Sequence, residues 1–274
     1  MRRTAPVLAL NAALAFLALL TVAPILWMVS ASLMASGEAA SLPLRLLPAA
    51  APSLEHYRVL FARLDFARAL GNSLFLAVAI TGVSLLANSM AGYAFAKLRF
   101  RGRDRLFALL VATLIVPPQV TVLPLFLELR VLGLVNTFTG VIVAGIATVF
   151  GIFLVRQFAL GIPDDLLDAA RIDGASELRI YWTIVLPLLR PILLTLGVFT
   201  FLAAWNDFMW PLIVLTDESK YTLPVAVANL SGEHVQDTEL MMAAAVVTVA
   251  PALLLFLALQ RYYVRGILMG GVKG

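Results

Sequence analysis

The sequence predicts an all-α integral membrane protein with six transmembrane helices. Hydrophobic residues make up 62% of the 274 residues and charged residues only 13%, which is too apolar a balance for a soluble domain. Six apolar segments are each long enough to cross, as a helix, a hydrocarbon core of roughly 30 Å. Cysteine is absent from the chain, which excludes a disulfide framework and thiolate-based metal or redox chemistry.

The predicted spans belong to a single transmembrane domain that covers residues 1–274. They are residues 7–34, 70–96, 106–127, 132–155, 190–215 and 240–260. The first span resembles a signal peptide in its Arg2-Arg3 start, but the uncharged stretch from Thr4 to Gly37 is far longer than a signal peptide's apolar region. We therefore expect it to be a retained helix.

The distribution of lysine and arginine predicts the orientation of the chain. The loops on the side of both termini carry 14 of the 20 basic residues, and the opposite loops carry 6. Positive charge stays inside, so both termini and the loop 161–187 are predicted to be cytoplasmic. The run Lys97–Arg105 is typical of a stop-transfer cluster, with a nucleic-acid or lipid-headgroup patch as the alternative.

The cytoplasmic loop 161–187 is predicted to contain a short helix. Pro163 can begin it, acidic residues at 164 and 165 suit its first turn, and Gly174 can end it. The helix would carry Leu166, Leu167, Ala169 and Ala170 in a loop that has no lipid to cover them. Such a helix either docks a partner protein or packs on its own bundle.

The same loop resembles a known family. Asp168-Ala169-Ala170, then Gly174, then Ile184-x-Leu186-Pro187 are similar to the "EAA" coupling loop of ABC-type importer permeases, where Glu usually stands in place of Asp168. The spans and the tail 260–274 resemble the maltose and multiple-sugar branch of that family. The resemblance implies a type I ABC importer permease fold and coupling to an ATPase through Asp168, Ala169, Ala170, Gly174, Ile184, Leu186 and Pro187.

The resemblance also implies the partners of the chain. They are a dimer of ABC ATPase subunits that binds ATP and magnesium, a second and different permease chain, and an extracytoplasmic solute-binding protein that contacts Ser231, Gly232 and Glu233. The setting would be the lipid bilayer of a prokaryotic cytoplasmic membrane, with no nucleic-acid partner and no cofactor on this chain. The expected solute is a disaccharide or oligosaccharide, with an amino sugar or a glycerol phosphate as alternatives.

Polar residues inside the spans are candidates for the substrate pathway. Asn88 lies among small residues at helical spacing, which also suits helix packing. Gln119 follows a Pro-Pro break, which either lines a wet cavity or forms a packing kink. Trp205, Asn206 and Asp207 provide an aromatic face and acceptors for a sugar, or belong to an interfacial aromatic belt.

Enzymatic functions find little support. The chain has no Gly-x-x-x-x-Gly-Lys-Ser/Thr loop for nucleotide phosphates, no Gly-x-Ser-x-Gly and no His-Glu-x-x-His. Its two histidines, His56 and His234, are isolated, so we expect no metal site. The remaining alternative is an ion-coupled secondary transporter, for which Asp207 is the one ionisable candidate inside a span.

Overall fold

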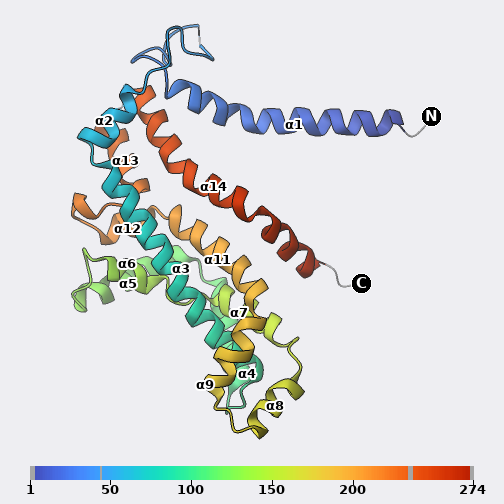
Figure 1. Cartoon of the computed structure of the whole chain (residues 1–274). Helices are drawn as coiled ribbons and strands as arrows, with labels where there is room; N and C mark the ends of the chain where they lie inside the picture. Colours follow the sequence, from blue (N-terminus) through green and yellow to red (C-terminus); the bar gives the residue numbers. More distant parts are fainter. Residues whose placement is uncertain (1–3, 44, 234–236, 272–274) are drawn as a thin grey trace. The chain divides into compact units, whose positions relative to one another are not determined.

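The computed structural model describes residues 4–43, 45–233 and 237–271, and all regular elements in these ranges are helical, as predicted (Figure 1). The chain forms two compact units. One comprises Met1–Arg68 and Leu223–Pro251, and the other comprises Ala69–Thr222 and Ala252–Gly274. Two long helices, α3 (Phe66–Lys97) and α14 (Thr238–Gly271), contribute residues to both units.

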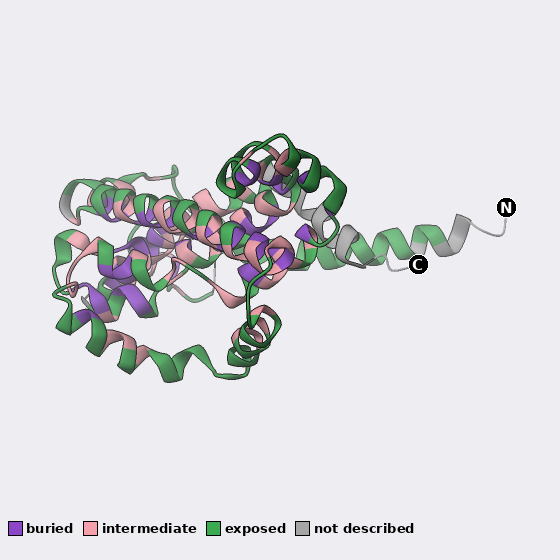
Figure 2. Ribbon diagram, turned by 90° about the horizontal axis from the view of Figure 1, so that it is seen from below, coloured by how far each residue is buried: buried purple, intermediate pink, exposed green. Residues whose placement is uncertain are grey.

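The first unit holds α1 (Thr4–Ala31), α2 (Glu55–Arg63), α13 (Leu223–Glu233) and the beginning of α14. Residues 10–26 of α1 are exposed along the whole stretch, and Figure 2 shows this helix in green next to the N-terminus. A helix that is apolar on all sides needs lipid or another helix around it. The short helix α2 has an acidic residue, Glu55, in its first turn.

Side-chain contacts order the loop between α1 and α2. The Glu38 carboxylate accepts hydrogen bonds from the backbone N–H groups of Ala35 and Ala49, and these bonds lower the pKa of Glu38. Glu239, at the start of α14, accepts a hydrogen bond of 2.6 Å from the backbone N–H of Ala39. The loop is therefore fixed both to itself and to α14.

The second unit is built around α3. Its other elements are α4 (Arg103–Ala112), η1 (Thr113–Ile115), α5 (Pro118–Val131), α6 (Phe138–Ala144), α7 (Val149–Ala159), α8 (Asp164–Ile172), α9 (Glu177–Ile180), the π-helical η2 (Tyr181–Val185), α10 (Leu186–Leu188), α11 (Arg190–Trp205), α12 (Met209–Val214) and η3 (Glu218–Lys220). One buried cluster joins α3, α7, α9 and α11 through Tyr93, Val155, Ile180 and Leu196.

Small residues bring α3 and α7 close together. A Cβ atom at Gly92 would lie 2.6 Å from Cγ1 of Val155 and 3.0 Å from the backbone nitrogen of Arg156. The predicted packing role of this small-residue stretch is therefore confirmed, because any larger side chain at Gly92 would force the helices apart.

Three helices are long and apolar enough to cross a membrane alone: Leu10–Ala31, Phe66–Lys97 and Thr238–Ala258. Three further helix pairs qualify only as bent spans. The bend is 107° between Arg103–Ile115 and Pro118–Val131, 50° between α6 and α7, and 78° between Glu177–Leu188 and α11. The described helices thus give three continuous spans, or six when each bent pair is counted once.

Three interruptions of the predicted spans have identifiable causes: two are the first two of these bends, and the third lies between α11 and α12. The predicted break lies at Pro117-Pro118, where α5 begins. The span 132–155 is interrupted before α7, where the Thr148 hydroxyl accepts a hydrogen bond of 3.1 Å from the N–H of Gly151 and so caps the helix. The span 190–215 is interrupted between α11 and α12, where Asp207 accepts a hydrogen bond of 3.3 Å from the N–H of Trp210.

Candidate functional site

The loop 161–187 forms the helix that the sequence predicts. Helix α8 begins after Pro163 with Asp164 and Asp165 in its first turn, where the helix dipole favours negative charge. It ends before Gly174, whose φ is +79°, and the N–H of the next residue bonds to the carbonyl of Ala170 at 3.0 Å. A Cβ at Gly174 would meet no atom within 4 Å, so the positive φ alone favours glycine here.

The inner face of this loop packs on the helix bundle. Leu167 of α8 is only 1% exposed and belongs to the same buried cluster as Tyr93 of α3. Two residues predicted to couple the chain to a partner, Ile184 and Leu186, are half-buried against that cluster. The hydroxyl groups of Tyr181 and Ser89 share a hydrogen bond of 2.7 Å, which joins η2 to α3.

The outer face of the loop exposes large apolar side chains. We define the α8–α9 face as the exposed residues Leu166, Ala169, Ile172, Leu178 and Trp182. Ile172 is 86% exposed, so its side chain makes almost no packing contact within the described chain. Exposed large apolar side chains are candidates for contact with another protein or with a membrane. Among the predicted coupling residues, Ala169 lies on this face, while Ile172, Leu178 and Trp182 were not among the predicted residues.

An ion-pair network holds α8 against α9. The guanidinium of Arg171 bonds to Asp168 at 2.6 Å and to Glu177 at 2.7 Å, and these carboxylates raise the pKa of Arg171. Glu177 also accepts a hydrogen bond of 2.8 Å from the hydroxyl of Tyr93 on α3. Asp168, a predicted coupling residue, lies on α8 itself and positions the guanidinium of Arg171, whose bond to Glu177 joins α8 to α9. The loop is tied to α3 by a polar contact as well as by its apolar face.

A second tie fixes the beginning of α8. The ammonium group of Lys97, at the end of α3, donates hydrogen bonds to the carbonyl of Ile162 at 2.6 Å and to the carboxylate of Asp164 at 2.7 Å. Its side chain is only 5% exposed, and its charge lowers the pKa of Asp164. In the sequence, Lys97 is one of five basic residues in the run 97–105, and nothing in the run shows which of them contacts α8, so this anchoring role was missed.

The predicted pathway residues lie in different surroundings. Asn88 is fully buried, donates a hydrogen bond of 2.9 Å to the hydroxyl of Ser84, and accepts one of 2.9 Å from the N–H of Thr148. Its polar atoms therefore hold α3 to the cap of α7. Gln119 is exposed in the first turn of α5. The structure places these two residues on separate features, a buried helix contact and a helix break.

The cluster Trp205–Asp207 lies at the break between α11 and α12. The Trp205 ring is 1% exposed and stacks on Phe201, with ring centroids 6.0 Å apart and planes inclined by 10°. Asn206 is exposed and its amide donates a hydrogen bond of 2.8 Å to the carbonyl of Leu202. The Asp207 carboxylate accepts a hydrogen bond from the N–H of Trp210 and so satisfies one of the free donors in the first turn of α12.

The predicted contact with a binding protein falls at the end of α13. Gly232 is exposed in that helix, while the side chains of Ser231 and Glu233 and all of His234 lie outside the described residues. Across the described part of the chain, no group of His, Cys, Asp and Glu residues could hold a metal ion.

Comparisons with known proteins assign the chain to a family. The model of the family "Binding-protein-dependent transport system inner membrane component" matches residues 85–269. The arabinooligosaccharides transport system permease protein AraQ of Halalkalibacterium halodurans is 37% identical over 277 residues, which cover 100% of this chain and 99% of that protein. The lactose transport system permease protein LacG of Rhizobium radiobacter is 31% identical, with 100% and 98% covered.

A solved structure shares the fold. It is a bacterial ABC transporter involved in the import of the acidic polysaccharide alginate, and one of its chains superposes with a TM-score of 0.83 at 26% identity. The superposition covers 95% of this chain and 98% of that one. The chain therefore belongs to the family of inner-membrane components of binding-protein-dependent transport systems.

Proposed function

We propose that the chain is the permease subunit of an ATP-driven carbohydrate importer in the cytoplasmic membrane of a prokaryote. The observation that carries this proposal is the α8–α9 face, an exposed apolar surface held on the helix bundle from behind. The full-length relatives that import arabinooligosaccharides and lactose support an oligosaccharide or disaccharide as the solute. Six spans and two cytoplasmic termini belong to the same proposal, because they put this face on the side that holds ATP.

The mechanism requires a stiff connection between the α8–α9 face and the spans. A dimer of ATPase subunits, which binds ATP and magnesium, would dock on this face and move it when the dimer closes. The contacts of Lys97 with Ile162 and of Glu177 with Tyr93 would transmit that motion to α3. The close approach at Gly92 and the bonds of Asn88 would carry it on to α7. The switch in access would then be a rigid-body movement.

Solute would enter from a binding protein on the other side. We place the contact with that protein at the loop that includes Ser231, Gly232 and Glu233. A second, homologous permease chain would complete the pathway, and the polar groups at the helix breaks, Gln119 and Asn206, would line it on this chain. Non-helical backbone at membrane depth occurs where it is covered by protein or lines a wet cavity, which suits both positions.

The test is co-purification of the ATPase subunit together with solute uptake. Ile172→Asp places a charge on the α8–α9 face without disturbing a buried contact, since the residue is 86% exposed. We expect this variant to lose both the ATPase subunit and uptake. Leu132→Asp is the matched control, because Leu132 is 66% exposed in the turn between α5 and α6. Uptake by Ile172→Asp at the normal rate, with the ATPase retained, would show that the face has been misassigned.

Two further measurements separate the coupling role from the choice of solute. Gly174→Asp adds a charge beside the face and is expected to abolish uptake, whereas Gly174→Asn, which tolerates the positive φ, is expected to retain most of it. Competition of uptake by an arabinooligosaccharide, lactose or sn-glycerol 3-phosphate identifies the solute class. Uptake driven by an ion gradient without any ATPase would instead favour a secondary transporter.

A further inference from the structure

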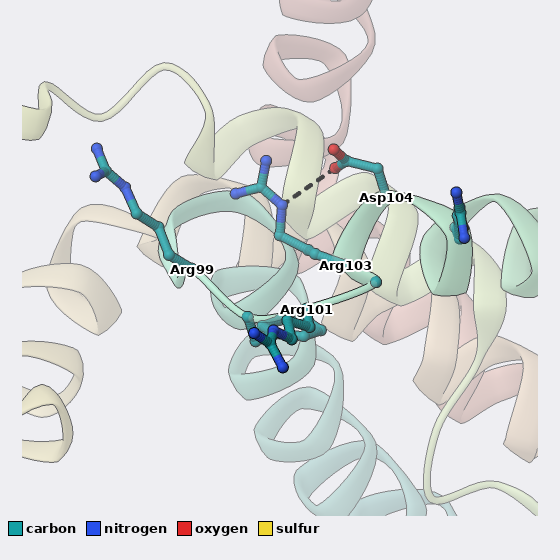
Figure 3. Close-up of a pocket in the computed structure, with 7 residues that line it drawn as sticks. Arg99, Arg101, Arg103 and Asp104 are labelled. Atoms are coloured by element: carbon teal, nitrogen blue, oxygen red, sulfur yellow. Dashed lines mark hydrogen bonds and ion pairs between the residues drawn. The ribbon is translucent and has the colours of Figure 1, made fainter.

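The turn that joins α3 to α4 arranges four arginines around an open cavity. The cavity has a volume of about 750 Å³ and is lined by residues 99–105 (Figure 3). The chain reverses at Gly102, whose φ is +81°, and the N–H of Leu106 bonds to its carbonyl at 2.9 Å. Arg99 and Arg101 extend in different directions from the turn in Figure 3.

One of the four arginines is hydrogen-bonded within the described part of the chain, and the other three are not. Arg103 points at Asp104, with a distance of 3.1 Å, and bonds to the carbonyl of Leu98 at 3.3 Å. Arg99, Arg101 and Arg105 are exposed, and in the described part of the chain they make no hydrogen bond or ion pair. Like charges repel, so an anion bound among these guanidinium groups would stabilise the turn.

Aromatic contacts give this turn a firm base. Phe95 of α3 contacts Phe100 in the turn, with ring centroids 5.9 Å apart, and Phe107 of α4, with centroids 5.5 Å apart. The guanidinium of Arg156 lies 4.1 Å from the centre of the Phe107 ring. The turn that lines the cavity is therefore held in place by contacts with α3, α4 and α7.

The position of the turn favours a lipid as the anion. It lies between two apolar helices, and the residues beside it, Phe100, Leu106 and Leu109, are 42%, 51% and 66% exposed. Arginines at the end of a span reach the headgroup layer of the bilayer, and basic clusters beside a span attract anionic lipids. The planar guanidinium group also matches a phosphate with two parallel hydrogen bonds.

We propose that this turn binds the phosphate headgroup of an anionic phospholipid through Arg99, Arg101 and Arg105. The ion pair of Arg103 with Asp104 keeps the turn in shape, and Phe100 and Leu106 contact the acyl region of the same lipid. The site adjoins Lys97, so a bound lipid lies beside the anchor of α8. This inference is independent of which solute the chain carries.

The test is lipid binding to the full-length chain in mild detergent, followed by native mass spectrometry during titration with phosphatidylglycerol or phosphatidylcholine. We expect the triple variant R99Q/R101Q/R105Q to bind phosphatidylglycerol about 100-fold more weakly, because each basic side chain near an anionic headgroup contributes on the order of 1 kcal/mol. R99K/R101K/R105K keeps the positive charges but cannot form two parallel hydrogen bonds to a phosphate. Its affinity for phosphatidylglycerol should lie between that of the wild type and that of R99Q/R101Q/R105Q. R58Q/R68Q/R130Q is the matched control and should bind like the wild type.

Several results would overturn the site. One is equal affinity of the wild type and R99Q/R101Q/R105Q for phosphatidylglycerol. Another is binding of phosphatidylcholine as tight as that of phosphatidylglycerol. Displacement of the lipid by millimolar inorganic phosphate would indicate a free-anion site. Loss of the ATPase subunit from R99Q/R101Q/R105Q with unchanged lipid affinity would instead make the turn part of a protein interface.

Discussion

Replacing Lys97 by methionine tests how the α8–α9 face is held. Methionine fills similar space but removes the ammonium group that bonds to the carbonyl of Ile162 at 2.6 Å. Because Lys97 is only 5% exposed, that bond is charge-assisted and shielded, and its loss is expected to cost about 2 kcal/mol. The pair with Asp164, whose side chain is 74% exposed, contributes little beyond this. The cost falls on the docking of α8 on α3.

Hydrogen exchange of the backbone amides measures this docking directly. A loss of about 2 kcal/mol in local opening speeds exchange by about 30-fold in residues 164–172. The amides of 70–90 on α3 should keep their rates. Lys97→Arg should restore most of the protection, and Asp164→Asn should change it only slightly. Unchanged exchange in Lys97→Met, or equal acceleration in α3 and α8, would refute the anchoring role.

Three further predictions concern charge, packing and polarity. Lys97 lowers the pKa of Asp164, so this ion pair is complete above the ordinary aspartate pKa of about 3.9 and is lost as the pH falls below it. Exchange in α8, corrected for intrinsic rates, should rise below about pH 4, and the rise should be slightly smaller in Asp164→Asn, because Glu177, whose pKa Arg171 lowers, titrates in the same range. Gly92→Ala should reduce the yield of folded chain, since its Cβ would lie 2.6 Å from a side chain on α7, whereas Gly82→Ala, with no atom within 4 Å, should not. Asn88→Leu should lower the free energy of unfolding by about 2 kcal/mol, seen as a lower melting temperature; loss of uptake at unchanged stability would instead assign Asn88 to the pathway.

Helix α8 could be predicted from the sequence because its signals are local. A proline before the first turn, acidic residues in that turn and a glycine after the last residue all lie within 12 positions, 163–174. Its supports could not be predicted in the same way. Lys97 and Asp164 are separated by 67 positions and Tyr93 and Glu177 by 84, so only the packed fold shows which charged residues meet.

The helix breaks also divide into one that a local sequence signal predicts and others that depend on contacts between distant residues. Pro117-Pro118 carries its own break, because proline lacks the N–H donor that a helix needs. The break before α7 has no comparable signal, since a hydropathy profile sees an uninterrupted apolar run there. It depends on Thr148, whose backbone N–H bonds to Asn88, a residue 60 positions away. Interruptions of this kind become visible only once the two helices are placed together.

The π-helical segment η2 sets how the side chains that follow it are rotated about the helix axis relative to the side chains that precede it. An α-helix advances by about 100° per residue, so a segment with wider turns changes the direction in which all later side chains point. Tyr181 and Val185 face the buried cluster at its two ends, and Leu189 does so one turn later. Deleting one residue from this segment would rotate the α8–α9 face relative to α11 by about 100°. The π-helical segment η2 thus allows the same stretch of chain to expose the α8–α9 face on one side and to bury Tyr181, Val185 and Leu189 on the other.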